Sequence, residues 1–600
     1  VAVSLFDVKD PTKPALLSKV PLGDNYSWSE VNSDEKALTV LPDAGLILVP
    51  YQGYTTNGYA SQVQLIDLGA TSLTARGVIE HRLQPRRATL HGDRVLSISG
   101  RELITVDATD RDHPTVTADT ALSWPVDRLF VQGDFLLEIA NGNSWNSDDP
   151  TLRVTLANQV DQELGAFNLG KFPVLGATLK SGRLYVAQGQ VDTGIIYILD
   201  ANGEQVAVPD TNAPNLFLSI FDVSQLPKIT QLGATSAIVP QLGWSPNLQP
   251  VWPRPEILVW SGGGGWPIWW GWGGGGISPL ARVASDVAST SFARPWFWGG
   301  SGGRLLAFDV SNANAPQFKS NLDLGTNGWW SFSSTFATDG LAFLSHQTSE
   351  FIEGVLPPGQ LPPTPTVVVD KETGQVVTNQ QPFGTWVQRY YLDVVDYTDA
   401  ANPTQRKPVN IPGTLQGISV GGALLYTSGY HWDPVTFSTD NTEWLDASAY
   451  DGVSASLVDS HSLSPSWPHP VLVDGKNIFV GHPAETDKEK NLLEVWTLSD
   501  TGKFVPMANP PLALPSAAQN LAVFGDLLAV QNGNDLQLFN KTAPSTLVFL
   551  GEGGPQGCLG YTLGNADGAV DRGLWLPLGD YGVARVNVPP TTSLPPARSP

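Results

Sequence analysis

The sequence predicts an all-β protein, and its composition, its turn residues and a recurring strand pattern all point to that class. The 600 residues include 60 glycines and 48 prolines, whereas charged residues make up only 15%. Glycine and proline interrupt helices and are frequent in turns, so this composition is typical of a turn-rich β fold. The length fits one large all-β domain or two or more domains.

A recurring hairpin pattern organises the chain. Each copy has an alternating apolar strand, a tight turn that contains glycine, and a second apolar strand. Copies are ATLHGDRVLSIS from Ala88, LFVQGDFLLEIA from Leu129, ATLKSGRLYVAQ from Ala177, VLVDGKNIFVGH from Val471 and LAVFGDLLAVQN from Leu521. The glycine supplies the positive φ that a hairpin turn requires, and the apolar runs are expected to be strands buried between neighbours.

A third strand follows each hairpin and often ends in aspartate. Examples are VSLFDV from Val3, LITVDA from Leu103, LSIFDV from Leu218 and LLAFDV from Leu305. Many of these strands continue through a proline-containing turn into a fourth strand. Four strands per unit, repeated about every 40 to 55 residues in about ten units, predict the blades of a β-propeller.

The unit count predicts two rings. Residues 1–173 would form partial or first propeller blades, and residues 174–590 a main propeller of about seven blades with insertions at 246–303 and 354–386. Residues 591–600 are expected to be an extended tail. The alternative is one large ring, closed by the strands near Val1.

Two segments carry a family resemblance. SLFDVKDPTKP, from Ser4, and SIFDVSQLPKI, from Ser219, resemble the LVIVD-type propeller repeat and the secreted bacterial proteins that have a C-terminal β-propeller distantly related to WD40 repeats. The resemblance extends in degenerate form over most of the chain and is weakest around residues 246–303. It implies a propeller fold and an extracytoplasmic location, that is secreted, periplasmic or at the cell surface. It implies no general activity.

The charge and the cysteine content exclude several classes. A formal net charge of -23 argues against a nucleic acid or an anionic membrane surface as partner, because both require a basic face. Cys558 is the single cysteine, so no disulfide can form within the chain. Residues 257–281 are uncharged over a length that could span a bilayer, but the nine glycines between Gly262 and Gly276 argue against a helix. No membrane-spanning segment is expected.

A tryptophan- and glycine-rich loop is the main candidate for binding. Its tryptophans are Trp260, Trp266, Trp269, Trp270 and Trp272, with Trp296 and Trp298 close by. Glycines cannot shield indole rings, and exposed apolar patches usually mark a partner interface. A protein interface is the functional interpretation, with stacking on carbohydrate as a smaller possibility. The competing interpretation is that the loop folds back onto its own propeller.

No catalytic residue or cofactor is predicted, and one loop is a weak candidate for Ca²⁺. The stretch from Tyr430 to Asp446 contains the carboxylates Asp433, Asp440, Glu443 and Asp446. Calcium takes six to eight oxygen ligands, but this spacing matches no known metal motif, so solvated turn residues are the simpler interpretation.

The sequence therefore favours a non-enzymatic extracytoplasmic β-propeller that serves as a structural or protein–protein interaction module in a cell-surface or secreted assembly. Its expected partners are other protein subunits or an N-terminal part of the same precursor. The alternative is a carbohydrate-binding protein or a hydrolase that uses the mouth of the propeller channel.

Overall fold

The structure is a computed structural model, and almost all of its regular structure is antiparallel β-strand, which confirms the all-β prediction. It describes residues 1–587 except for 24–26, 56–57, 143–148, 190–194, 200–204, 210–213, 240–247, 263–302, 325–330, 357–365, 370–375, 380–382, 432–441, 464–468, 485–489, 508–510, 542–546, 556–562 and 570. The chain divides into two compact units. Unit 1 holds Val1–Asp127 and Leu578–Val583, and unit 2 holds the other described residues.

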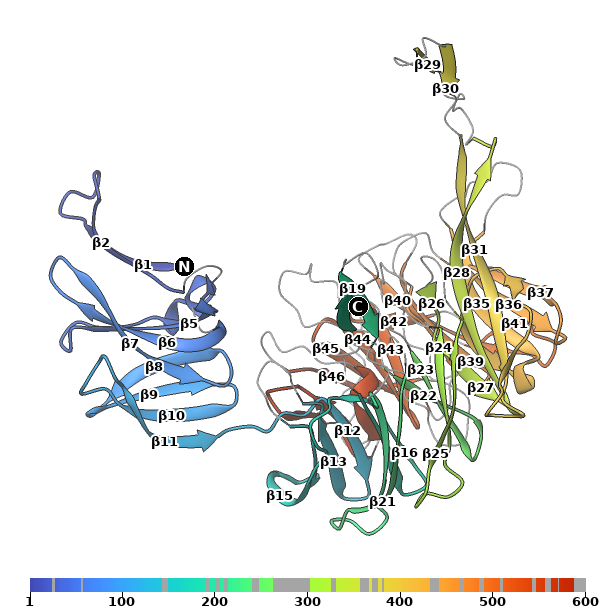
Figure 1. Cartoon of the computed structure of the whole chain (residues 1–600), viewed down its shortest axis with the longest axis horizontal. Helices are drawn as coiled ribbons and strands as arrows, with labels where there is room; N and C mark the ends of the chain where they lie inside the picture. The colour runs from blue at the N-terminus through green and yellow to red at the C-terminus, as the bar shows by residue number, and fades with distance from the viewer. Residues whose placement is uncertain are drawn as a thin grey trace. The chain divides into compact units, whose positions relative to one another are not determined.

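Unit 1 contains three sheets that follow one another along the chain (Figure 1). The first sheet has only two strands, β1 (Ala2–Asp7) and β2 (Ala15–Pro21). The second contains β3 (Ser27–Trp28), β4 (Thr39–Leu41), β5 (Leu46–Thr55), β6 (Gly58–Leu68) and β7 (Leu73–His81), with the 3-10 turns η1 (Glu30–Asn32) and η2 (Glu35–Ala37) between β3 and β4. The third contains β8 (Pro85–His91), β9 (Arg94–Ser99), β10 (Glu102–Asp107) and β11 (Thr115–Ala121).

Unit 2 contains eight blades, our term for the successive sheets, in the part of the chain that the structure describes. Blade 1 is β12 (Arg128–Gln132), β13 (Phe135–Ala140), β14 (Thr151–Leu156) and β15 (Gln159–Asn168). Blade 2 is β16 (Val174–Lys180), β17 (Arg183–Gly189), β20 (Leu216–Asp222) and β21 (Thr230–Ala237). Blade 3 is β22 (Gln249–Arg254), β23 (Ile257–Gly262), β24 (Arg304–Asp309) and β25 (Gln317–Asp323).

Blade 4 is β26 (Ser331–Phe332), β27 (Phe336–Thr338), β28 (Leu341–Glu353), β31 (Gly384–Asp396), β32 (Thr404–Gln405) and β33 (Val409–Ile411). Blade 5 is β34 (Thr414–Ser419), β35 (Leu424–Tyr430), β36 (Glu443–Tyr450) and β37 (Ala455–Ser462), with the 3-10 turn η3 (Val420–Gly422) after β34. Blade 6 is β38 (Val471–Asp474), β39 (Asn477–Pro483), β40 (Asn491–Leu498), β41 (Phe504–Pro506) and β42 (Leu512–Leu514).

Blade 7 is β43 (Asn520–Phe524), β44 (Leu527–Asn532), β45 (Asp535–Asn540) and β46 (Val548–Gly553). Blade 8 is β47 (Asp567–Ala569), β48 (Gly573–Pro577) and β49 (Val583–Val586), preceded by the 3-10 turn η5 (Leu563–Asn565). Two small hairpins lie in connections, namely β18 (Ile195–Leu199) with β19 (Gln205–Pro209), and β29 (Thr366–Val369) with β30 (Val376–Asn379).

Unit 2 is a closed ring. β16 contacts β22, β22 contacts β27 and β28 of blade 4, and β28 contacts β34. The first strands then contact one another from β34 through β38 and β43 to β47, and β12 contacts β47 and β48. The closing contact includes a hydrogen bond of 2.7 Å from the backbone N–H of Val131 to the Asp567 carboxylate. Blade 1 packs against blade 2 through an apolar layer that contains Phe130, Leu152 and Val186. The sequence-based boundary between residues 173 and 174 falls between β15 and β16, within this unit.

Apolar layers between successive blades form the core. Leu218 and Ile220 of β20 pack with Leu258 of β23 and Phe308 of β24, and all four side chains are fully buried. Comparable layers join blades 3 to 7 in turn. Both faces of each central strand are therefore buried, which explains why the sequence gives continuous apolar runs there instead of a simple alternation.

The aspartate that ends many third strands shapes the turn that follows. Its carboxylate accepts a hydrogen bond from the backbone N–H two residues later, a local arrangement that favours turns. The pairs are Asp7–Lys9, Asp107–Thr109, Asp222–Ser224, Asp309–Ser311 and Asp396–Thr398, with distances of 2.8 to 3.0 Å. The side-chain hydroxyl of Ser311 also donates to Asp309 and holds the pKa of that carboxyl below its ordinary value.

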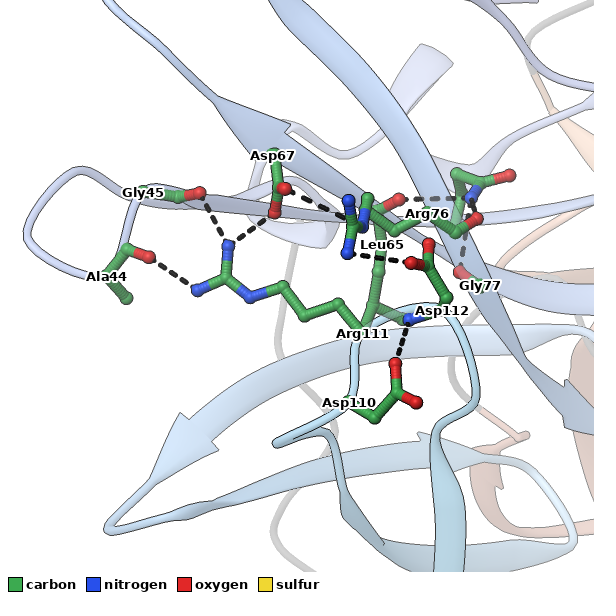
Figure 2. Close-up of polar contacts among 10 residues, drawn as sticks. Ala44, Gly45, Leu65, Asp67, Arg76, Gly77, Asp110, Arg111 and Asp112 are labelled. Carbon is green, nitrogen blue, oxygen red and sulfur yellow. Dashed lines mark hydrogen bonds and ion pairs between the residues drawn. The ribbon is translucent and has the colours of Figure 1, made fainter.

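In unit 1 this turn also ties neighbouring sheets together (Figure 2). Arg111, in the turn between β10 and β11, donates to the carbonyl oxygens of Ala44 and Gly45 at 2.6 and 3.0 Å and to the Asp67 carboxylate at 2.5 Å, all in the preceding sheet. Arg76 of β7 forms an ion pair of 2.8 Å with Asp112 in the same turn. Each arginine thus joins one sheet to the next.

At the bulge of the fourth strand, the turn of the next sheet packs closely against a glycine. A Cβ atom on Gly77 would lie 2.6 Å from the Asp112 carbonyl oxygen, and one on Gly233 would lie 2.6 Å from the Ala313 carbonyl oxygen. At Gly165, which occupies the same place in β15, the nearest atom would be the Pro227 carbonyl oxygen at 3.4 Å. The approach of the turn therefore requires glycine at two of these positions and tolerates a methyl group at the third.

We predict that Gly233→Ala destabilises unit 2 by about 1–3 kcal/mol, because backbone must move to accommodate the new methyl group. Thermal unfolding followed by circular dichroism measures the effect. The matched control is Gly165→Ala, the same change at the equivalent bulge, which we expect to shift the unfolding midpoint little. Equal midpoints for the two variants would contradict the role of the close approach.

Candidate functional site

All long connections of the ring begin and end at one edge of the blades. In an antiparallel sheet of four successive strands, the connection from strand two to strand three lies at the edge opposite the 1–2 and 3–4 turns. The 2–3 connections include residues 190–215, 263–303, 354–383 and 431–442. The 1–2 turns at the other edge are as short as residues 181–182, 339–340 and 475–476. We call the two edges the connection face and the turn face.

Histidine–carboxylate pairs gather at the connection face. Most involve residues near the end of a second or fourth strand or near the start of a third strand, and His469 precedes a first strand, because these positions share that edge. His346 and Asp393 lie inside β28 and β31, which continue beyond the blade at the same edge. The described pairs in unit 2 are His346–Asp393 at 2.5 Å, His431–Asp446 at 2.9 Å, His461–Glu494 at 3.3 Å, His469–Glu443 at 2.8 Å and His482–Glu494 at 3.1 Å. The pairs span three neighbouring blades, 4 to 6.

Two of these pairs join blades 5 and 6. Glu443, the first residue of β36, accepts from His469 Nδ1 just before β38, and both side chains are almost fully buried. Glu494 of β40 interacts with His461 of β37, with His482 of β39 and with the indole N–H of Trp496 at 2.9 Å. Although burial opposes it, hydrogen bonds from these three side chains hold the pKa of Glu494 below its ordinary range.

Blades 4 and 5 repeat a unit of histidine, aromatic ring and aspartate. In blade 4 His346 stacks on Tyr391 with ring centroids 5.2 Å apart, and in blade 5 His431 stacks on Trp444 at 4.8 Å and an interplanar angle of 3°. The aspartate lies two residues after the aromatic residue in both strands, at Asp393 and Asp446. The carboxylate thus fixes one nitrogen of the imidazole while the aromatic ring covers its face.

Such a pair can orient an imidazole for proton transfer or for ligand binding. The solvent exposure of the histidine side chain differs between the pairs. The side chains of His469 and His346 are only 2% and 6% exposed, whereas that of His431 is 35% exposed. The buried His469–Glu443 pair therefore joins blades 5 and 6, and the buried His346–Asp393 pair joins two strands of blade 4. Of the three histidines, His431 is the one whose ring a ligand could reach.

Unit 1 contains the same bridge between sheets. His81, at the end of β7, contacts Glu102 at the start of β10 at 3.1 Å and the Ser97 hydroxyl at 2.6 Å. Burial lowers the pKa of this histidine. The position matches that of His461 and Glu494 in unit 2, because both pairs join a fourth strand to the next third strand. The pairing is therefore a repeated structural device.

Of the tryptophans predicted to bind a partner, only Trp260 is among the described residues. Trp260 lies in β23 and is fully buried in the layer between blades 2 and 3, where a Cβ on Gly176 would come within 2.7 Å of its ring. Its indole is thus part of the core and has no surface for a partner. Trp266, Trp269, Trp270, Trp272, Trp296 and Trp298 lie outside the described residues.

The four candidate Ca²⁺ ligands are not brought together among the described residues. Glu443 and Asp446 each pair with a histidine, and Asp446 also accepts from the Ser460 hydroxyl at 2.6 Å. Asp433 and Asp440 lie outside the described residues. Within the part of the chain that is described, no group of three or more histidine, cysteine or acidic residues is arranged to hold a metal ion.

Sequence reasoning missed the histidine pairs, because the histidines are widely spaced along the chain. The available signal was an aromatic residue followed two residues later by an acid near the start of a third strand, as in Tyr391-Leu392-Asp393 and Trp444-Leu445-Asp446. Because strands two and three of a blade pair side by side, a histidine on strand two or directly after it lies next to this aromatic residue and acid on strand three.

One comparison with known proteins, a family model that matches the start of the chain, supports the fold. Residues 1–91 match a family model described as a beta propeller domain. A putative 6-phosphogluconolactonase from Bacteroides fragilis is 10% identical, with a TM-score of 0.31 and coverage of 71% of this chain and 95% of that chain. A periplasmic gluconolactonase from Pseudomonas aeruginosa is also 10% identical, with a TM-score of 0.31 and coverage of 75% and 99%.

A hypothetical selenium-binding protein from Sulfolobus tokodaii is 10% identical, with a TM-score of 0.23 and coverage of 77% of this chain and 89% of that chain. No curated protein sequence matches the chain. The chain is a β-propeller protein in fold, and likenesses this distant carry no argument about activity. Among the described residues, no helix combines the length and the apolar character that crossing a bilayer requires.

We predict that Glu494→Gln lowers stability at pH 7 by about 3 kcal/mol, because it removes the charged partner of two histidines. The folded-state pKa of Glu494 is depressed, so its stabilisation is present above the ordinary glutamate pKa and is lost as pH falls through the folded-state value. The deficit of the variant should therefore shrink as the pH is lowered below about 4.

Thermal unfolding midpoints between pH 7 and pH 3 measure this effect. Glu552→Gln, which changes an exposed carboxylate in β46, is the control and should leave the midpoint at pH 7 unchanged. A constant difference between Glu494→Gln and the parent protein at all pH values would show that the carboxylate charge is not the cause.

Proposed function

We propose that this protein is a non-enzymatic β-propeller whose connection face binds a protein partner in an extracytoplasmic assembly. The observation that carries the proposal is the difference between the two edges of the ring. Tight two-residue turns occupy many positions of the turn face. The strands at the connection face are joined by connections of up to 41 residues, such as 263–303. Loops on a rigid scaffold commonly carry binding, and a ring presents them side by side.

An exposed aromatic pair supports this choice of face. Strands β28 and β31 continue beyond blade 4 as a two-stranded ribbon (Figure 1), in which Phe351 lies opposite Trp386. Their rings are 5.3 Å apart, and Trp386 is 63% exposed. Ser349 and Gln388, opposite each other on the same side of the ribbon, are also exposed, whereas Val387 on the other side is buried.

An accessible tryptophan next to a second aromatic ring fits a protein interface, where tryptophan is enriched among the residues that contribute most to affinity. An isolated two-stranded ribbon is also marginally stable in water, so contact with a partner would stabilise it. The predicted docking hairpin at residues 354–386 includes the connection between β28 and β31, and the six tryptophans outside the described residues belong to the connection between β23 and β24.

The location outside the cytoplasm is part of the proposal. It is supported by the resemblance of the third-strand segments, such as SLFDVKDPTKP, to secreted propeller proteins, and by the low content of oxidisable sulfur, with one cysteine and one methionine. Fractionation of cells that express the full-length protein at its native level tests the location directly. Recovery in the cytoplasm alone would contradict this part.

We predict that the double change Phe351→Ser and Trp386→Ser abolishes partner binding without unfolding the ring. The full chain is purified under native conditions from its source cells, and native mass spectrometry measures how much partner accompanies it. Loss of two central aromatic contacts, each contributing about 2 kcal/mol or more, should reduce the retained partner at least tenfold. The thermal unfolding midpoint should change little, because both side chains are exposed.

The matched control is Val453→Ser, which removes an apolar side chain that is 81% exposed in the 3–4 turn of blade 5, on the turn face. This variant should retain the partner. Retention by both variants would rule out the connection face, and loss from the control alone would assign binding to the turn face.

A second candidate is a carbohydrate-binding protein or hydrolase that acts at the same face. The observation that favours it is the parallel stack of His431 on Trp444 beside the Asp446 carboxylate. The imidazole ring of His431 is partly exposed and lies next to a carboxylate that can accept hydrogen bonds. Soluble neutral oligosaccharides can be titrated against tryptophan fluorescence and assayed for hydrolysis. Quenching that disappears in His431→Ala, or hydrolysis that does, would favour this candidate.

A further inference from the structure

The two-stranded sheet of unit 1 corresponds to the last two strands of a blade. Asp7 ends β1 and accepts from the Lys9 N–H, as the aspartate does at the end of third strands β10, β20, β24 and β31. The β1–β2 register shifts between Leu5 and Phe6, two residues before the aspartate. The pairs β10–β11, β20–β21 and β24–β25 shift at the same place. β1 is therefore a third strand and β2 a fourth.

β1 has one unpaired edge among the described residues. It pairs only with β2, whereas the third strands of the other sheets, such as β20 between β17 and β21, pair on both sides among the described residues, except β49 of the three-stranded blade 8. An unpaired edge presents a row of backbone N–H and C=O groups that can bind a further strand. Among the described residues, no strand lies on the side of β1 where a second strand lies in the other blades.

One face of this sheet is also uncovered. Val3, Leu5, Val20 and Leu22 pack against the next sheet. Phe6, however, is 49% exposed, whereas the equivalent Phe221 and Phe308 are 1% and 0% exposed. Val8 is 62% exposed, whereas the equivalent Val223 and Val310 are 0% and 3% exposed. Leu16, opposite Phe6, is 54% exposed.

The equivalent residues identify what normally covers this face. Phe221 and Val223 pack against Phe130, Leu137 and Ile139 of the preceding blade. Phe308 and Val310 likewise pack with Leu175 and Tyr185 of the blade before theirs. The face that contains Phe6 and Val8 therefore has the apolar residues that, in the other blades, pack against a preceding blade.

The eight blades of unit 2 already have neighbours within the ring among the described residues. Each of its eight blades contacts two neighbours within the ring, and its third strands are paired on both sides among the described residues, except for the three-stranded blade 8, where β49 ends the sheet. β49 is a single edge strand of blade 8, so it does not supply the two strands that β1 lacks.

We propose that β1 and the Phe6 face bind a further polypeptide of the same repeat type, which supplies strands one and two of this sheet and a blade stacked on Phe6, Val8 and Leu16. A strand added to β1 would satisfy its edge hydrogen bonds, and the stacked blade would remove the exposed apolar side chains from water. The partner is defined by its chemistry: an apolar β-hairpin with a glycine turn, followed or preceded by a sheet with alternating apolar residues.

Accessibility of position 6 in the native assembly tests the proposal. Phe6→Cys is placed in a Cys558→Ser background, so that the introduced thiol is the single one in the chain. The protein is isolated under native conditions from its source cells and labelled with a maleimide. We expect labelling about tenfold slower than at Val453→Cys in the same background, because a covered thiol reacts slowly, and equal rates in the isolated chain.

The covering segment is identified with a photo-crosslinking amino acid at position 6. Cross-links to a peptide with the alternating hairpin pattern from outside residues 1–600 support the proposal. Labelling at position 6 as fast as at position 453 in the native assembly overturns it. So do cross-links between two copies of residues 1–600, which would mean self-association, and cross-links to a polypeptide without propeller repeats. The assay does not depend on the aromatic pair of the ribbon, so its failure is distinct from failure of the proposed function.

Discussion

The structure depends on one constraint: a strongly apolar sheet must have both of its faces covered by neighbouring sheets. Central strands such as β24, whose residues Leu305 to Phe308 are all fully buried, alternate their side chains between the layer before and the layer after. No such sheet is stable in water alone, and a row of them always leaves two uncovered ends. Closing the row into a ring removes both ends at once, which is what β12 and β47 accomplish in unit 2.

Polar contacts at the two edges of the blades add specificity to this apolar packing. At the turn face, the aspartate at the end of the third strand shapes a loop that reaches back to a glycine or an arginine contact on the preceding sheet. At the connection face, histidine–carboxylate pairs such as His469–Glu443 join neighbouring blades. Apolar layers are non-directional, so these directional contacts fix the register of one sheet against the next.

The sequence predicts the architecture well because the fold is encoded locally and repeatedly. Glycine turns, aspartate-terminated strands such as LSIFDV and proline-containing loops all lie within one repeat, and all appear where expected. The candidate site is less predictable. Trp260 ends the apolar run of β23 and is buried in the core, yet its closeness to the following tryptophans favours a binding role when the sequence alone is considered. His469 and Glu443 are 26 residues apart, and only the stacking of blades 5 and 6 makes them neighbours.

The difference in connection length between the turn face and the connection face affects where insertions can be tolerated during evolution. At the turn face, two-residue 1–2 turns reverse the chain tightly, and 3–4 turns come close to a glycine of the preceding sheet, as at Gly233. A change of length in either kind of turn therefore disturbs packing. At the opposite edge, the ends of strands two and three are held 5 Å or so apart by the sheet itself, and lengthening the link costs only about 0.6 kcal/mol for each doubling. New segments, including whole foreign domains, can be grafted there while the ring stays unchanged. Descendants of this fold should therefore diverge along a single rim.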